Sequence, residues 1–115
     1  MSNSPLLDLT RAKAFAFEEE QLHELVVTFE QSLTQEIAVI QAGLASDDAL
    51  KVEHSLHVLK GFMPLFSVEC LAQNITDLYQ NCRQQPLSVT GAAFTALVPS
   101  LERLLVEVRA YLRAL

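Results

Sequence analysis

Apolar side chains recur at steps of three or four residues along four stretches of the chain, the spacing that places them on one face of an α-helix. The first stretch spans residues 18–44, about seven helical turns, and carries Leu22, Val26, Phe29, Leu33, Ile37, Ile40 and Leu44. The later stretches carry Val52, Leu56, Leu59, Met63 and Phe66, then Val68, Leu71, Ile75, Leu78 and Cys82, and then Phe94, Leu97, Leu101, Leu104, Val108 and Leu112. No segment alternates as a strand does, so the pattern predicts an all-α protein.

The joints between these stretches contain residues that end and begin helices. Gly43 can adopt the left-handed conformation of a helix C-cap. The run Ser46-Asp47-Asp48 supplies an N-cap and first-turn acids for the second helix. Ser67 is expected to be the N-cap of the third helix, with Glu69 in its first turn.

Three prolines limit the helices further. Pro64 has no N–H to donate to the Lys60 carbonyl, so we expect the second helix to kink or end within one turn of it. Pro86 should end the third helix. Pro99 falls inside the fourth apolar stretch and should bend that helix or mark its start.

Four such helices joined by short breaks predict an antiparallel up-down-up-down four-helix bundle. We expect residues 1–115 to form this single domain, with a short extra N-terminal helix over residues 7–14 and a flexible segment at residues 1–6. The fold by itself does not indicate a function.

Composition and charge limit the classes of partner that the protein can bind. The chain has 115 residues, of which half are hydrophobic, and 14 acidic residues against 8 basic ones give a net charge of −6. This is the wrong sign for a nucleic-acid binder. There is no signal-peptide pattern and no run of eighteen apolar residues, so we expect no membrane span. The two cysteines suit a reduced environment, and we expect a cytoplasmic monomer.

Most signatures of enzymes and metal proteins are absent from the sequence. It contains no nucleotide-binding glycine motif, no GxSxG and no HExxH. A dinuclear metal site in a helical bundle needs two ExxH pairs and two further carboxylates. Glu20 and His23 form the single ExxH pair, and both are interpreted as surface residues. We therefore expect no metal and no cofactor on this chain.

The second helix carries an unusual outward face. His57 lies roughly 140° from the direction of the core stripe, so it cannot be a core histidine. Lys60 lies one turn along, and Gly61 is almost opposite the core, where a mid-helix glycine costs about 1 kcal/mol relative to alanine. His54 and Pro64 are expected on the same outward side of the helix. A neutral imidazole can attack phosphorus, a lysine can neutralise phosphoryl oxygens, and a glycine permits close approach of a partner. Alternatively, these are ordinary surface residues.

The sequence Leu56-His57-Val58-Leu59-Lys60-Gly61 resembles the His-x-x-Lys-Gly motif of histidine-containing phosphotransfer (HPt) domains of multistep two-component phosphorelays. The resemblance extends over residues 7–115. It implies that His57 accepts a phosphoryl group from a receiver-domain aspartate and passes it to another receiver, with Lys60 and Gly61 assisting. The implied partners are response regulators or a hybrid sensor kinase. Mg²⁺ would be held by the receiver, and no ATP-dependent kinase activity is implied.

A docking surface is expected around His57. The third helix should present Ala72, Thr76, Tyr79 and Arg83 beside the second, and with His54, Val58, Pro64 and Leu65 these would form a largely apolar patch for a receiver. Alternatively, Tyr79 merely packs on the edge of the bundle. The other functional interpretation is a helical adaptor that binds a receiver or a partner helix without phosphotransfer.

Overall fold

Four long helices follow one another in the structure, which is a computed structural model and describes residues 4–114. They are α1 (Glu19–Ala45), α2 (Ala49–Phe66), α3 (Glu69–Asn81) and α4 (Leu87–Arg113), preceded by a 3-10 helix, η1 (Ala12–Ala14). Within residues 4–114 there is no strand, only an isolated β-bridge between Leu7 and Ser67. The predicted all-α class with four helices is confirmed.

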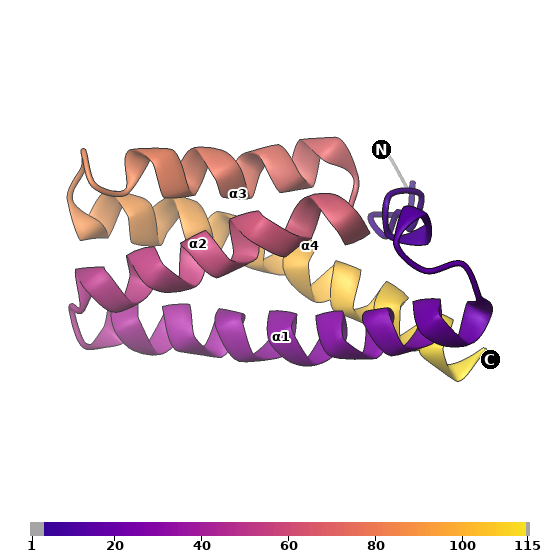
Figure 1. Cartoon of the computed structure of the whole chain (residues 1–115). Coiled ribbons are helices and arrows are strands. Elements are labelled where there is room, and N and C mark those ends of the chain that lie inside the picture. Colours follow the sequence, from indigo (N-terminus) through magenta and orange to yellow (C-terminus); the bar gives the residue numbers. More distant parts are fainter. Residues whose placement is uncertain (1–3, 115) are drawn as a thin grey trace.

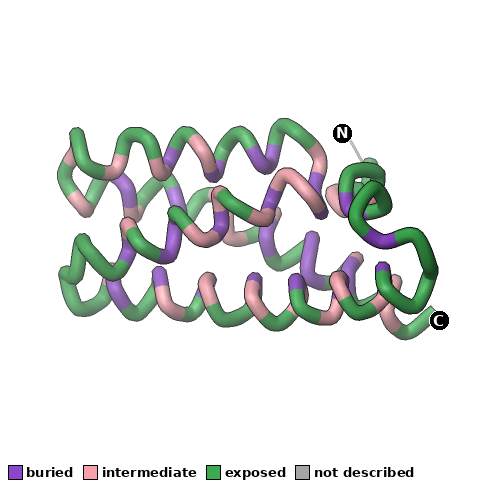
Figure 2. Tube along the Cα trace, viewed as in Figure 1, coloured by how far each residue is buried: buried purple, intermediate pink, exposed green. Residues whose placement is uncertain are grey.

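The helices pack side by side around one hydrophobic core. Both α1 and α3 lie beside α2 and α4 (Figure 1). Buried positions recur along the inner side of each helix, and exposed positions face outward (Figure 2). Val26, Leu56, Ile75 and Leu104, one from each helix, are completely buried. Burial of one apolar side per helix is what the sequence pattern requires.

Most of the predicted core positions are buried. The exceptions are half-buried, and they are Leu44, Val68, Cys82, Leu97 and Leu112. Four of these five belong to the last turns of a helix or to its flanking residues, where fewer neighbours cover a side chain.

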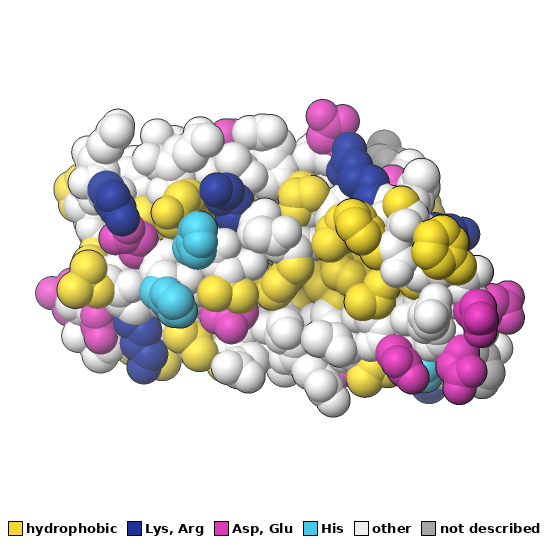
Figure 3. Space-filling model, viewed as in Figure 1, with side chains coloured by type: hydrophobic (Ala, Val, Ile, Leu, Met, Phe, Trp, Pro, Cys, Tyr) yellow, Lys and Arg dark blue, Asp and Glu magenta, His cyan; other side chains and the backbone are white. Residues whose placement is uncertain are grey.

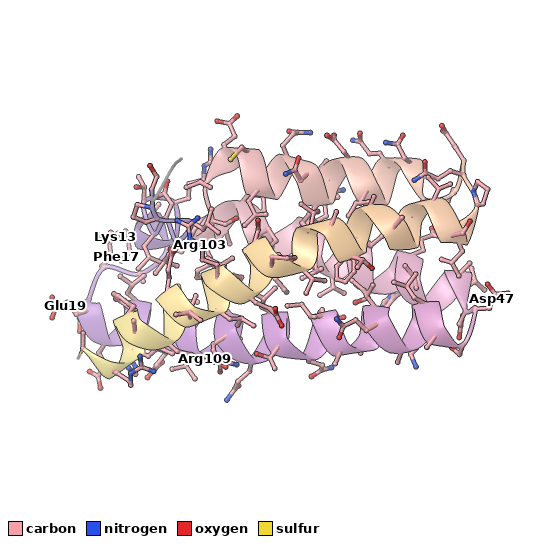
Figure 4. All side chains as sticks on the ribbon, turned by 180° about the vertical axis from the view of Figure 1, so that it is seen from behind. Lys13, Phe17, Glu19, Asp47, Arg103 and Arg109 are labelled. Atoms are coloured by element: carbon pink, nitrogen blue, oxygen red, sulfur yellow. The ribbon has the colours of Figure 1, made fainter. Side chains whose placement is uncertain are left out.

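The turn between α1 and α2 differs from the prediction in one respect. Gly43 lies inside α1 with an ordinary helical φ, so its predicted role as a left-handed cap is wrong. The helix continues to Ala45, and the left-handed residue is Asp47, with φ of 57° (Figure 4). Aspartate is among the non-glycine residues that tolerate this conformation. Asp48 is the N-cap of α2, and its carboxylate accepts a hydrogen bond from the Lys51 N–H at 3.1 Å.

Ser67, between α2 and α3, does not have the role predicted for it. α2 ends at Phe66, within one turn of Pro64, as predicted. Ser67 is not the N-cap of α3, because its hydroxyl donates to the Met63 carbonyl at 2.8 Å and thereby completes the end of α2. Val68 occupies the N-cap position instead and makes no side-chain cap.

The predicted helix over residues 7–14 is not confirmed over its whole length. Only η1 is helical there, and the preceding backbone pairs with the end of α2, where Asp8 N–H donates to the Phe66 carbonyl and Val68 N–H to the Leu6 carbonyl, each at 2.9 Å. These bonds require extended rather than helical backbone. Of the predicted flexible segment 1–6, residues 1–3 lie outside the described residues.

The C-terminal helix is tied to α1 and to the N-terminal segment. The guanidinium group of Arg109 pairs with Glu30 at 3.0 Å on the rear face of the bundle (Figure 4). The Glu107 carboxylate accepts hydrogen bonds from the N–H groups of Leu6 and Leu7 at 2.7 and 2.8 Å.

By length and composition alone α4 could cross a membrane, a property shared by core helices of soluble proteins.

Candidate functional site

The outward face of α2 carries the predicted motif. His54, His57 and Gly61 are exposed, and Lys60 is half-buried, whereas Leu59 on the inner side is fully buried. The exposure predicted for His57 is therefore confirmed. Figure 3 shows two histidines close together on one face of the molecule, with basic side chains on either side and hydrophobic side chains beyond them.

Tyr79 of α3 contacts both polar members of the motif. Its ring centroid lies 5.2 Å from that of the His57 imidazole, with an angle of 47° between the ring planes. The Lys60 Nζ lies 5.0 Å from the same centroid, within the range of a cation–π contact. Tyr79 is half-buried and packs against the hydrophobic core. It is therefore a fixed surface against which His57 and Lys60 are placed.

Gly61 leaves open space beside the motif. A Cβ atom built at this position would meet no atom within 4 Å outside its own stretch of helix. At Gly43, by contrast, the added Cβ would lie 2.8 Å from Cγ2 of Val52. Internal packing thus explains the glycine at 43 but not the one at 61.

An ion pair on the other side of His57 was not foreseen from the sequence. Arg83, in the turn that follows α3, donates from Nε to the Oε2 atom of Glu53 on α2. The hydrogen bond that Arg83 donates to Glu53 raises the pKa of the guanidinium further above its usual value, so the group stays charged. The signal available in the sequence was the position of Glu53, four residues before His57 and hence on the same helical face.

These residues surround a shallow, open hollow of about 330 Å³ whose lining is Leu50, Glu53, His54, His57, Tyr79 and Arg83. The lining combines one anionic, one cationic and two imidazole side chains with the Tyr79 ring. Both partners of the ion pair and the imidazole of His57 thus border the same solvent-filled space.

The predicted docking residues are only partly brought together at the surface. Thr76, Val58, Pro64 and Leu65 are half-buried. Arg83 is exposed, but it lies in the turn after α3, which ends at Asn81, so its predicted place on that helix is wrong.

Ala72 does not belong to that surface, which corrects the prediction. Its exposed fraction is 5% and it forms part of the core cluster. The physical reason is that α3 packs against both α2 and α4, so its buried arc is wider than a single stripe.

No group of three or more His, Cys, Asp or Glu side chains arranged to hold a metal ion occurs among residues 4–114. Glu20 is exposed and His23 is half-buried, both on α1.

Comparison of the chain with known protein families, with curated proteins and with solved structures found no match.

Proposed function

We propose that this chain is a histidine phosphotransfer protein of a multistep phosphorelay, in which His57 accepts a phosphoryl group from an aspartate of a receiver domain and passes it to another receiver. The observation that carries the proposal is the placement of His57 and Lys60 on one exposed helical face, both against the Tyr79 ring. An exposed histidine can meet a phosphoryl group presented by a second protein, whereas a core histidine cannot.

The proposed transfer is a displacement at phosphorus. An unprotonated ring nitrogen of His57 attacks, the N–P bond forms, and the P–O bond to the aspartate breaks, so that the aspartate leaves as a carboxylate. Histidine suits this role because imidazole offers a ring nitrogen that can act as a nucleophile near neutral pH. Transfer to the second receiver is the reverse reaction with a different carboxylate.

The neighbouring residues of α2 have separate roles in this proposal. Lys60 neutralises charge on the phosphoryl oxygens as a flexible point charge. Gly61 keeps the surface beside His57 low enough for the receiver backbone to approach, consistent with the open space beside it. Mg²⁺ would be held by the acidic residues of the receiver, and this chain needs no ATP site.

The proposal also includes the topology that this role requires. We infer an antiparallel up-down-up-down bundle, supported by the order of neighbouring helices and the short joints between them. In such a bundle α2 and α3 form one accessible layer, which a receiver can reach without contacting α1 or α4. A cytoplasmic monomer that binds receivers, and neither nucleic acid nor membrane, is part of the same proposal.

The deciding experiment uses a phosphorylated receiver. The chain is incubated with receivers shown to bind it, and the product is tested for a phosphate that is labile in acid and stable in alkali. We expect label on the wild type and none on His57→Gln. If receivers bind the chain but leave no such label on it, the protein is a helical adaptor instead.

A further inference from the structure

The ion pair between Glu53 and Arg83 lies one helical turn from the contact between His57 and Tyr79. Glu53 is four residues before His57 on α2, and Arg83 is four residues after Tyr79, in the turn that follows α3. One pair therefore links α2 to α3 and the other links α2 to the turn after α3, and both pairs line the same hollow.

The two members of this ion pair differ in accessibility. The Arg83 side chain is 72% exposed, whereas that of Glu53 is only 18% exposed. An ion pair as open as this one contributes little to folding, since solvent screens it and long side chains lose freedom in forming it. A contribution to folding stability therefore does little to explain why these two residues are paired.

Arginine chemistry offers a more specific reason. The planar guanidinium group presents a fork of N–H donors that matches phosphate oxygens as well as carboxylate oxygens. A phosphoryl group on His57 would place a second anion beside the hollow that Arg83 already borders. The guanidinium could then move from Glu53 to the phosphoryl oxygens by rotation of its own side chain.

We propose that Arg83 is the second cation of the phosphoryl site, held by Glu53 while His57 is unmodified and released to the phosphoryl oxygens as the N–P bond forms. This rests on the proposed function, since it takes His57 as the acceptor. Glu53 is a positioning residue that competes with the phosphoryl group for the same guanidinium.

The competition predicts effects of opposite sign for the two partners. Glu53→Gln removes the competitor and should speed phosphorylation of His57, whereas Arg83→Gln removes the cation and should slow it. A purely structural ion pair predicts the same sign for both, because either change breaks the same contact. Arg83→Lys keeps the charge but loses the fork, so its rate should fall between those of the wild type and Arg83→Gln.

The test uses phosphoramidate as a chemical phosphoryl donor, so that no receiver is needed. A ring nitrogen of His57 displaces ammonia from phosphorus: the N–P bond to the ring forms, the donor P–N bond breaks, and ammonia takes up the proton that the ring gives up. Mass spectrometry of the intact chain and its peptides measures the rate of labelling at His57. N-acetylhistidine in the same sample is the internal reference, and thermal unfolding of each variant checks that it is folded.

A double-mutant cycle separates the proposal from a general change in surface charge. We expect Glu53→Gln to raise the rate about two- to fivefold and Arg83→Gln to lower it by a similar factor, the range typical of exposed ion pairs. In the Arg83→Gln background the gain from Glu53→Gln should disappear. An equal gain with and without Arg83, or slowing by Glu53→Gln, overturns the proposal.

The outcomes of this double-mutant cycle can be distinguished from the outcomes of the experiment that tests phosphotransfer from receivers. If receivers fail to label His57 while the cycle behaves as expected, the phosphoryl site stands and the relay function is wrong. If receivers label His57 but the cycle shows no coupling, the relay function stands and the role of Arg83 is wrong.

Discussion

The Lys60 ammonium lies 5.0 Å from the centroid of the Tyr79 ring, and the same ring lies 5.2 Å from the imidazole of His57. One aromatic side chain on α3 therefore limits the positions of two polar groups on α2. A cation over an aromatic face is attracted to it by about 0.5–1 kcal/mol at exposed sites. The contact is strong enough to bias the position of Lys60 and weak enough to let it move toward a phosphoryl group.

Replacing Tyr79 tests this arrangement. Tyr79→Leu removes the aromatic face, and we expect it to slow labelling of His57 by a phosphorylated receiver about two- to fivefold, the rate equivalent of a lost cation–π contact. Tyr79→Phe keeps the ring and is the matched control, with a rate close to that of the wild type. If the phenylalanine variant were as slow as the leucine variant, the hydroxyl rather than the ring would be the important group.

The two histidines of the hollow are distinguished by substitution. His57→Ala should abolish transfer, whereas His54→Ala should retain most of it, because His54 has no lysine and glycine at the spacing that follows His57. Peptide mapping of the phosphorylated chain under non-acidic conditions locates the label. Retained labelling in His57→Ala would show that the acceptor has been assigned to the wrong residue.

Lys60 is expected to act on rate rather than on stability. Lys60→Ala should slow transfer both from and to a receiver, and Lys60→Arg should retain part of the activity, because the role needs a positive charge. The free energy of unfolding should fall by no more than about 1 kcal/mol, the value of the cation–π contact with Tyr79, since the ammonium group carries no ion pair among the described residues. Reactions quenched at a series of times measure the rate of transfer from the receiver to the chain and from the chain to the receiver. A rate that falls in only one of these directions would contradict a role in stabilising phosphoryl charge.

Gly61→Ala should raise stability and lower activity together. The added methyl group meets nothing within the molecule, so helix propensity favours the variant by up to about 1 kcal/mol in the free energy of unfolding. In the proposed function the receiver approaches at this methyl group, so transfer should slow.

Gly43→Ala is the matched control for this comparison. Its methyl group would crowd Val52 at 2.8 Å, so it should lower stability and leave the transfer rate of the folded protein unchanged. Urea unfolding and receiver labelling are measured on both variants. A wild-type transfer rate in Gly61→Ala would show that close approach is not the reason for that glycine.

The two cysteines should differ in reactivity with pH. Burial, and to a smaller extent the nearby Glu53 carboxylate, raises the pKa of the Cys82 thiol, while Cys70 is exposed. The thiolate is the form that reacts with iodoacetamide, and the raised pKa lowers the fraction of Cys82 that is thiolate at a given pH. Iodoacetamide should therefore label the exposed Cys70 first at pH 8. The difference should narrow as the pH rises through the raised pKa and vanish in denaturant. Equal labelling rates in the folded protein at pH 8 would contradict this environment for Cys82.

Much of the fold could be predicted from the sequence because helical periodicity is a local property. The spacing from Leu22 to Ile40 predicts a buried stripe, and the structure confirms each of these positions. The exposure of His57 follows from the same geometry, since its angle from the stripe depends only on residues of its own helix. The end of α2 at Phe66, within one turn of Pro64, was likewise predicted from a local property, the missing N–H of proline.

Other features depended on contacts between segments that are distant along the chain. The expected N-terminal helix is mostly replaced by backbone pairing of Leu6 and Asp8 with the end of α2. At the N-terminus the local preference is therefore overridden by hydrogen bonds that only the assembled bundle makes available. Ser67 is a different case, because two local roles compete: its hydroxyl bonds to the Met63 carbonyl four residues earlier instead of capping α3.

By itself the sequence determined the helical class, the buried side of each helix, and the exposed face that carries His57, Lys60 and Gly61, because all three depend on spacing within one helix. Only the tertiary structure decided that Ala72 is buried, that Tyr79 touches both His57 and Lys60, and that Arg83 pairs with Glu53. These outcomes depend on how far α3 is rotated and shifted along α2. That register is set by the packing of many core side chains at once, and no single-helix pattern contains it.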